Sequence, residues 1–220
     1  MWSQRRRCAP RTPRILVIGD SLTASSAIWR LLLTNSERVR LGGLAAPQFV
    51  GGVALDFGQA GSAASGWETD DALTQATLDV PLYRADVGII WIGTNDAQKR
   101  GAGTGTPPTR AASVANVSST VDLFATALAH VILVDKLQPN TTAAKETEMV
   151  ATSAAVRTMI LAHSWYLAGH VTIVDLWTPT TAIVGWDVSQ YTDDTHYNDT
   201  GNAIPAAAFA TAMATAWPVR

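Results

Sequence analysis

The 220-residue sequence has little cysteine, little charge and no long apolar run. Its one cysteine, Cys8, has no partner within the chain, so no intramolecular disulfide is possible and stability must come from packing. Charged residues make up 15% and the formal net charge is -2, which predicts no strong attraction to nucleic acid or to an anionic membrane. No apolar run approaches the roughly 18 residues of a membrane span, so we expect a soluble protein.

The N-terminal residues do not form a clear export signal. Three arginines at residues 5–7 resemble the start of a signal peptide, but Pro10, Arg11 and Pro13 follow where an apolar segment is required. The sequence leaves the compartment open, secreted or cytoplasmic, and it leaves the oligomeric state open as well. We expect residues 1–13 to form a tail and residues 14–220 to form a single domain, since no repeat or linker divides them.

Apolar runs alternate with segments of helical spacing along the chain. The runs are short and continuous, which is typical of strands buried on both faces of a parallel sheet. We predict five strands, at residues 15–18, 48–50, 87–92, 131–134 and 170–176. Helices are predicted at residues 25–33, 68–78, 113–129, 142–167 and about 199–216, and loops at residues 53–67, 101–108 and 178–195. The sequence therefore predicts an α/β fold with a five-stranded parallel sheet between two helical layers.

Ser21 follows the first predicted strand in the stretch Gly19-Asp20-Ser21-Leu22. Reactive groups gather at the carboxyl ends of strands in open α/β sheets, so Ser21 is a candidate nucleophile. The alternative is an ordinary strand exit in which Asp20 or Ser21 caps the next helix.

A polar segment near the other end of the chain contains the partners that a serine nucleophile requires. A neutral imidazole must take the hydroxyl proton, and a carboxylate must orient the imidazole. His196 lies beside two carboxylates, and Asp193, three residues earlier, can reach back across a turn. We expect Asp194 to point elsewhere. We interpret the other histidines as structural: His130, His163 and His170.

Acyl transfer also needs hydrogen-bond donors for the oxyanion. The candidates are the backbone N–H of Ser21, the side-chain amide of Asn95 after the predicted strand at residues 87–92, and a glycine N–H in the loop at residues 53–67. Gly66 and Gly61 are both possible donors. Each glycine can instead serve a turn, and Asn95 can cap one.

Together these motifs resemble those of the SGNH, or GDSL-like, hydrolases. Gly19-Asp20-Ser21-Leu22, a loop glycine, Gly93-Thr94-Asn95-Asp96 and Asp193-Asp194-Thr195-His196 occur in the order of that family, from residue 15 to about residue 210. The resemblance implies a flavodoxin-like three-layer α/β/α sandwich. It also implies a Ser21, Asp193 and His196 triad, with Asn95 and the loop glycine in the oxyanion hole.

The details are most similar to carbohydrate esterases of the family-three acetylxylan esterase type. Ser65-Gly66-Trp67 matches their second block, so Gly66 is favoured as the oxyanion glycine, with Gly61 as the alternative. Two residues depart from the family pattern: Asp194 stands where a glycine usually follows the triad aspartate, and Tyr197 where a proline usually follows the histidine. We expect these changes to affect loop shape and substrate preference and to leave the triad atoms intact. Trp67 and Trp186 are candidates for a sugar-facing role.

We therefore expect a serine esterase that removes short acyl groups, in particular acetyl from a polysaccharide such as xylan, with no metal or other cofactor. One alternative is a lysophospholipase or thioesterase of the same family with a longer acyl preference. A second alternative is a non-catalytic carbohydrate-binding domain. The expected partners are a small acyl ester or acetylated carbohydrate, without nucleic acid.

Overall fold

The computed structural model describes residues 14–24, 48–49, 66–83 and 85–216. Three predictions lie outside these ranges: the tail at residues 1–13, the helix at residues 25–33 and nearly all of the loop at residues 53–67, including Gly61. In the described part of the chain, no helix is both long and apolar enough to cross a bilayer.

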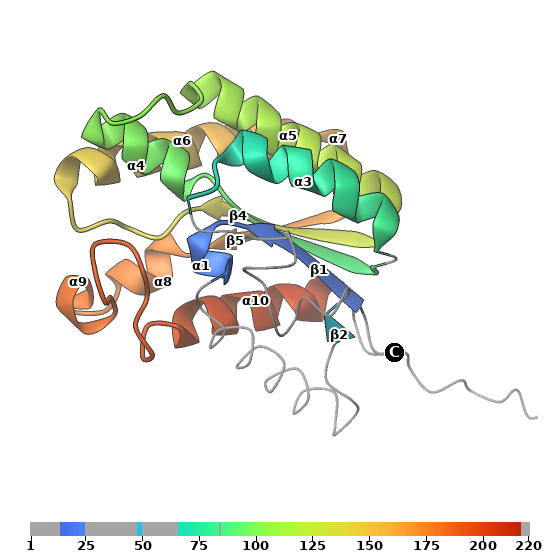
Figure 1. The fold of residues 1–220 in the computed structure, drawn as a ribbon. Helices are drawn as coiled ribbons and strands as arrows, with labels where there is room; N and C mark the ends of the chain where they lie inside the picture. The colour runs from blue at the N-terminus through green and yellow to red at the C-terminus, as the bar shows by residue number, and fades with distance from the viewer. Residues whose placement is uncertain (1–13, 25–47, 50–65, 84, 217–220) are drawn as a thin grey trace, which may run out of the picture.

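All five predicted strands are present among the described residues and form one parallel sheet (Figure 1). The sheet order is β2-β1-β3-β4-β5. β2 lies on one side of β1 and the later strands lie on the other, so the order in which strands are added reverses at β1. The strands are β1 (Arg14–Gly19), β2 (Gln48–Phe49), β3 (Val87–Trp91), β4 (His130–Lys136) and β5 (Val171–Asp175). The register aligns Gly19 with Trp91, so β1 and β3 end side by side.

Helices cover both faces of the sheet (Figure 1). One layer contains α3 (Thr69–Leu82), α4 (Thr94–Ala102), α5 (Arg110–Ala127), α6 (Ala143–Ala162) and α7 (Ser164–Leu167). The opposite face is covered by α10 (Ala203–Ala216). Three short helices lie at the end of the molecule where β1 and β3 finish: α1 (Ser21–Ala24), α8 (Trp177–Thr181) and α9 (Trp186–Ser189).

Two apolar clusters fill the spaces between the layers. The first lies mainly under α10, where Trp91 packs against Phe209 with ring centroids 5.7 Å apart. The second lies under α3, α5 and α6 and includes Ile90, Phe124 and Ile160. Alternate residues of β1 and β3 enter opposite clusters, as the two-residue strand period requires. The fold is the predicted three-layer α/β/α sandwich with flavodoxin-like strand order.

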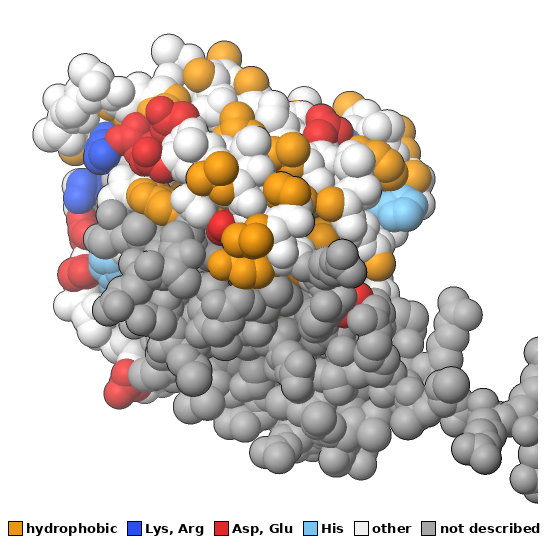
Figure 2. Space-filling view, turned by 45° about the vertical axis from the view of Figure 1, so that its right-hand side comes forward, with side chains coloured by type: hydrophobic (Ala, Val, Ile, Leu, Met, Phe, Trp, Pro, Cys, Tyr) orange, Lys and Arg blue, Asp and Glu red, His pale blue; other side chains and the backbone are white. Residues whose placement is uncertain are grey.

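Some large apolar side chains of the described residues are exposed on the outer helices. Leu78 and Leu82 of α3 are among the exposed apolar side chains. On the face shown in Figure 2, hydrophobic and uncharged groups alternate, and the basic side chains among the described residues gather at one edge.

Several helix boundaries were predicted wrongly. Residues 101–102 belong to α4 and not to a loop, because the helix continues from the polar cluster after β3 until Gly103, whose left-handed backbone (φ 64°) ends it. The single helix predicted at residues 142–167 is broken at His163, which is extended and accepts a hydrogen bond from the Trp165 N–H at the start of α7. Residues 178–195 were predicted to be irregular, yet they contain most of α8 and all of α9, which are too short to show a periodic pattern. The last helix begins at Ala203, later than predicted, with Pro205 in its first turn as expected.

Candidate active site

Ser21 lies at the sharp turn between β1 and α1. The Asp20 carboxylate accepts the Leu22 N–H at 3.0 Å and the Asp20 carbonyl accepts the Thr23 N–H at 3.0 Å, so Asp20 closes the first turn of α1. The Oγ of Ser21 lies 2.9 Å from Nε2 of His196. The capping role expected for Asp20 or Ser21 therefore falls to Asp20.

His196 is held between Ser21 and a carboxylate. Its Nδ1 lies 2.8 Å from Oδ2 of Asp193. The other oxygen of Asp193 accepts the backbone N–H groups of Thr195 and His196, both at 2.7 Å. A carboxylate fixed in this way favours the imidazole tautomer with hydrogen on Nδ1, which leaves the Nε2 lone pair facing the Ser21 hydroxyl.

The electrostatics of Asp193 keep it ionised. Partial burial raises the pKa of Asp193, but hydrogen bonds from the His196 and Thr195 backbone and from the His196 ring outweigh this effect and lower it. Asp194 points away from the imidazole, as predicted: its carboxylate pairs with Lys145 of α6 at 2.5 Å and accepts the Thr195 hydroxyl at 2.8 Å.

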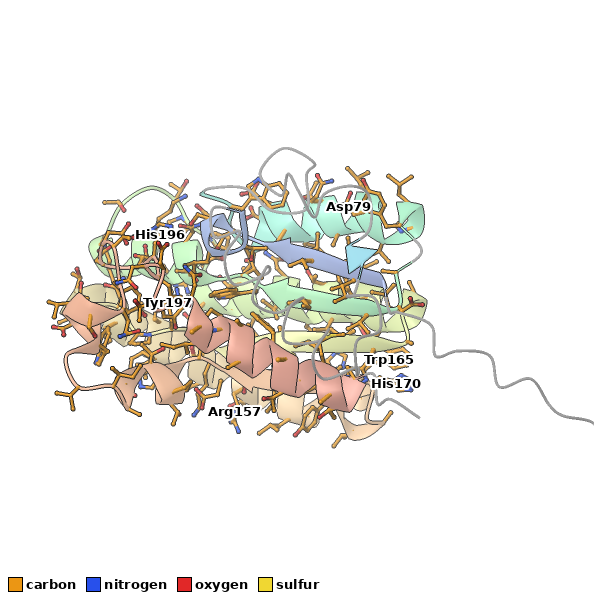
Figure 3. All side chains as sticks on the ribbon, turned by 90° about the horizontal axis from the view of Figure 1, so that it is seen from below. Asp79, Arg157, Trp165, His170, His196 and Tyr197 are labelled. Carbon is orange, nitrogen blue, oxygen red and sulfur yellow. The ribbon has the colours of Figure 1, made fainter. Side chains whose placement is uncertain are left out.

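The loop that carries His196 is anchored at both ends. Tyr191 and Tyr197 form an isolated antiparallel bridge, and their rings stack with centroids 5.0 Å apart. The Tyr191 hydroxyl donates to the carbonyl of Pro139 at 2.9 Å, and the Tyr197 hydroxyl lies 2.8 Å from that of Thr180. The two departures from the family pattern, Asp194 and Tyr197, therefore both contribute to fixing this loop. Figure 3 shows His196 and Tyr197 near the α1 end of the sheet, far from His170 and Trp165.

Asn95 lies in the first turn of α4, directly after β3. Gly93 precedes the helix with φ 107°, a left-handed conformation that a β-carbon would strain. The Asn95 amide donates to the carbonyl of Trp67 at 2.9 Å. One of its two N–H groups thus fixes the segment after Gly66, and the second remains for another acceptor. Gly66 itself is exposed, with φ 83°.

The Asp96 carboxylate links α3, α4 and α5 next to Asn95, a role that the sequence did not predict. The side chain is fully buried, and its carboxylate accepts the Thr69 hydroxyl at 2.7 Å, the Thr69 N–H at 3.0 Å and the Ser113 hydroxyl at 2.7 Å. Thr69 begins α3, Asp96 is in the first turn of α4 and Ser113 is in α5. The only available signal was the carboxylate inside Gly93-Thr94-Asn95-Asp96.

Asp20 is a second residue whose environment the sequence did not reveal. Burial raises the pKa of this carboxyl from an ordinary 3.8 to about 7, opposed by the Leu22 N–H and by the nearby His196 ring. Its position in the strand exit was visible, but complete burial depends on the packing around it.

Residues 17–204 match the model of the GDSL-like Lipase/Acylhydrolase family. The match covers most of the chain. The chain belongs to the GDSL-like lipase/acylhydrolase family. As a member of that family it is an ester hydrolase, which confirms the enzyme class expected from the sequence. A comparison with curated protein sequences gives no significant match.

Solved structures of low sequence identity share the fold of this acylhydrolase. LAE5, an alpha/beta hydrolase from the metagenome of Lake Arreo, Spain, aligns with a TM-score of 0.72 and 18% identity over 95% of this chain and 96% of its own. A lipase/acylhydrolase from Enterococcus faecalis gives 0.71 and 18% over 92% and 95%. The acetylxylan esterase Axe2 from Geobacillus stearothermophilus gives 0.71 and 14% over 96% of both chains.

The remaining histidines of the acylhydrolase make structural contacts. Nε2 of His130 lies 2.8 Å from the Thr172 hydroxyl, between β4 and β5. His163 caps α7, and His170 packs edge-on against Trp165. Among the tryptophans, Trp91 is fully buried and Trp165 packs at the edge of the second cluster. Trp186 packs against Tyr191 and the first cluster, and Trp67 against the second.

Proposed function

We propose that this acylhydrolase is a serine esterase in which Ser21 is the nucleophile, His196 the general base and Asp193 the residue that orients and stabilises the imidazole. The observation that carries the proposal is the unbroken chain of short contacts, 2.9 Å from Ser21 Oγ to His196 Nε2 and 2.8 Å from His196 Nδ1 to Asp193 Oδ2. Both distances lie within the range of a working nucleophile–base pair.

Hydrolysis proceeds in two halves. Nε2 of His196 takes the Ser21 proton as Oγ bonds to the ester carbonyl carbon, and the same proton then passes to the departing alcohol oxygen. The acyl group is left on Ser21. His196 next takes a proton from water, whose oxygen attacks the acyl carbon, and returns that proton to Ser21 as the carboxylic acid leaves.

We assign the oxyanion donors to the backbone N–H of Ser21, the backbone N–H of Gly66 and the side-chain amide of Asn95. The support for Asn95 and Gly66 is the hydrogen bond from Asn95 to the Trp67 carbonyl, which ties the two segments together beside the end of β3. Gly61 lies outside the described residues and stays the alternative to Gly66.

For the substrate, we propose a short acyl ester on a carbohydrate, of the acetylxylan type. The support is the resemblance of Ser65-Gly66-Trp67 to the second block of such esterases and the shared fold of the Axe2 acetylxylan esterase. We further propose that residues 14–220 act as a single domain, since the family match runs from β1 to α10 and spans every strand of the sheet.

The test compares p-nitrophenyl acetate with the octanoate ester, in the wild-type enzyme and the Ser21→Ala variant. Ser119→Ala, on the outer face of α5, is the matched control. We expect a clear preference for acetate and a loss in kcat of roughly 10³- to 10⁶-fold in Ser21→Ala alone. A preference for octanoate would instead assign a longer acyl group to the substrate. This is the natural alternative, because a lipase/acylhydrolase from Enterococcus faecalis shares the fold. Full activity in Ser21→Ala would reject the mechanism.

A further inference from the structure

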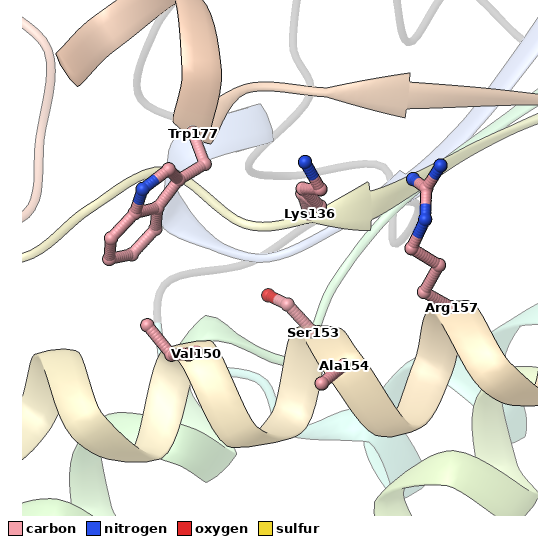
Figure 4. Close-up of a pocket in the computed structure, with 6 residues that line it drawn as sticks. All are labelled: Lys136, Val150, Ser153, Ala154, Arg157 and Trp177. Atoms are coloured by element: carbon pink, nitrogen blue, oxygen red, sulfur yellow. The ribbon is translucent and has the colours of Figure 1, made fainter.

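A cavity outside the triad lies between α6, α8 and the end of β4 (Figure 4). It encloses about 370 Å³, within the range of small-molecule binding sites. Its lining combines an aromatic ring, two cationic side chains, a hydroxyl and two small apolar side chains: Trp177, Lys136, Arg157, Ser153, Val150 and Ala154.

Each cation that lines the cavity is already paired with a carboxylate. Lys136 Nζ lies 2.6 Å from Asp175, and the Arg157 guanidinium lies 2.5 Å from Asp135, which is buried. Two positive and two negative groups therefore cancel. The pairing leaves further N–H donors on both cations, because an ammonium carries three and a guanidinium five. The cavity offers hydrogen-bond donors without a net positive charge, which suits neutral oxygen acceptors better than an anion.

Trp177 is held in place by the same network. Asp175 accepts the Thr178 N–H at 2.9 Å and the Thr178 hydroxyl at 2.8 Å, and so fixes the first turn of α8, where Trp177 lies. In Figure 4 the indole ring extends over α6 on the side of Val150, with Lys136 and Arg157 beyond it. An aromatic face next to hydrogen-bond donors is complementary to a ligand ring that is apolar on its C–H face and carries oxygen acceptors at its edge.

We propose that this cavity binds one unsubstituted pyranose unit of the carbohydrate whose ester is cleaved at Ser21. The inference rests on the proposed function and specifies its substrate as an oligomer longer than the acetylated unit. Trp177 stacks on the sugar ring, and Lys136, Arg157 and Ser153 donate to its hydroxyl oxygens.

The position of the cavity in the fold is compatible with this role. Lys136 ends β4, and α8 follows β5, so the cavity is at the same edge of the sheet as Ser21. β4 and β5 are two and three strands from β1, or roughly 10 to 15 Å across the sheet. Helix α6, which forms one wall, also contacts the His196 loop through Lys145 and Asp194.

The test measures xylotriose binding by isothermal titration calorimetry. We expect the wild-type enzyme to bind xylotriose with an affinity that changes less than about twofold between low and high sodium chloride concentrations, because the ligand is neutral. Trp177→Leu should weaken binding by about tenfold or more through loss of the stacking face. Trp165→Leu, a half-buried tryptophan on α7, is the matched control and should bind as the wild type does.

A second variant tests the cavity without removing any hydrogen bond. Ala154 is exposed on α6, so Ala154→Phe should fill the cavity and weaken xylotriose binding, whereas Ala162→Phe, also exposed on α6, should not. The two control variants, Ala162→Phe and Trp165→Leu, lie outside the cavity lining and should keep the wild-type rate on p-nitrophenyl acetate.

The possible results distinguish failure of the pyranose site from failure of the proposed esterase function. Binding that is lost in Trp177→Leu and Ala154→Phe supports the pyranose site. Absence of xylotriose binding, binding equal in all variants, or tighter binding of glucuronate with strong salt dependence would overturn it, even if Ser21-dependent ester hydrolysis is intact. Loss of that dependence on Ser21 would instead reject the proposed esterase mechanism.

Discussion

At the residue scale, two adjacent aspartates of the His196 loop have different partners. Asp193 contacts the His196 ring and two backbone N–H groups, whereas Asp194 contacts Lys145 and Thr195. The sequence could favour Asp193 because three residues is the distance across a turn. It could not reveal that Asp194 anchors the loop, since Lys145 is far away in the sequence.

This difference gives a matched pair of variants. Asp193→Asn should lower kcat on p-nitrophenyl acetate roughly 10³- to 10⁴-fold, because an amide cannot stabilise the imidazolium or hold the required tautomer. Asp194→Asn should change kcat by less than about tenfold, because it loosens only the loop. Steady-state kinetics of the two variants test whether Asp193 is the residue that orients His196. Equal losses in kcat would contradict that assignment.

The buried carboxyl of Asp20 should make stability depend on pH. Its pKa of about 7 in the folded protein lies above the ordinary 3.8, so the folded state retains a proton that the unfolded state has lost between these values. Stability should therefore fall as pH rises from about 4 to about 7 and level off above that. Asp20→Asn keeps the acceptor for the Leu22 N–H and removes the charge. It should raise the melting temperature at pH 8 relative to the wild type and have little effect at pH 4; an equal shift at both would contradict the assignment.

At the element scale, apolar runs predicted all five strands. The signature is clearest for the central strands β1, β3 and β4, which are buried on both faces. The helix ends were harder to predict. α4 begins in the polar cluster after β3 and ends on Gly103, and its mixed composition hides it among loop residues. The break at His163 depends on local backbone geometry, and the short α8 and α9 lack enough turns for a period to appear.

Asp96 should prove essential for joining the elements around the site. Asp96→Ala leaves the Thr69 and Ser113 hydroxyls without their buried acceptor and should lower the free energy of unfolding by about 2 to 4 kcal/mol. Asp70→Ala, an exposed position in the same turn of α3 as Thr69, should cost under about 1 kcal/mol. Urea denaturation of both variants makes the comparison, and similar losses would show that the network is not important.

Gly101 marks a close approach between α4 and α6. A β-carbon there would lie 2.6 Å from the Ala144 carbonyl oxygen, so Gly101→Ala should separate the helices and cost about 1 to 3 kcal/mol. At Gly103 a β-carbon would meet no atom of the described residues, and asparagine tolerates the left-handed backbone. Gly103→Asn is therefore the control, and its melting temperature should stay close to that of the wild type.

At the scale of the whole molecule, the sheet order explains how distant parts of the chain meet. β1 and β3 are neighbours, which brings Ser21 and Asn95 to one edge, and the His196 loop returns to that edge before α10 packs on the sheet. The order of motifs indicated this closure through the family resemblance. The spacing of residues alone could not, because contacts between residues 175 positions apart depend on the complete fold.

The most direct test of the account is labelling with a fluorophosphonate, which forms a covalent bond from its phosphorus to an activated serine oxygen as fluoride leaves. Peptide mass spectrometry should find one adduct per chain, on Ser21, and ester hydrolysis should be lost at the same rate as the adduct forms. The adduct should be absent in His196→Gln, which retains the serine but has no base to activate it. An adduct on a different serine, or full hydrolysis by a chain labelled at Ser21, would contradict the central claim.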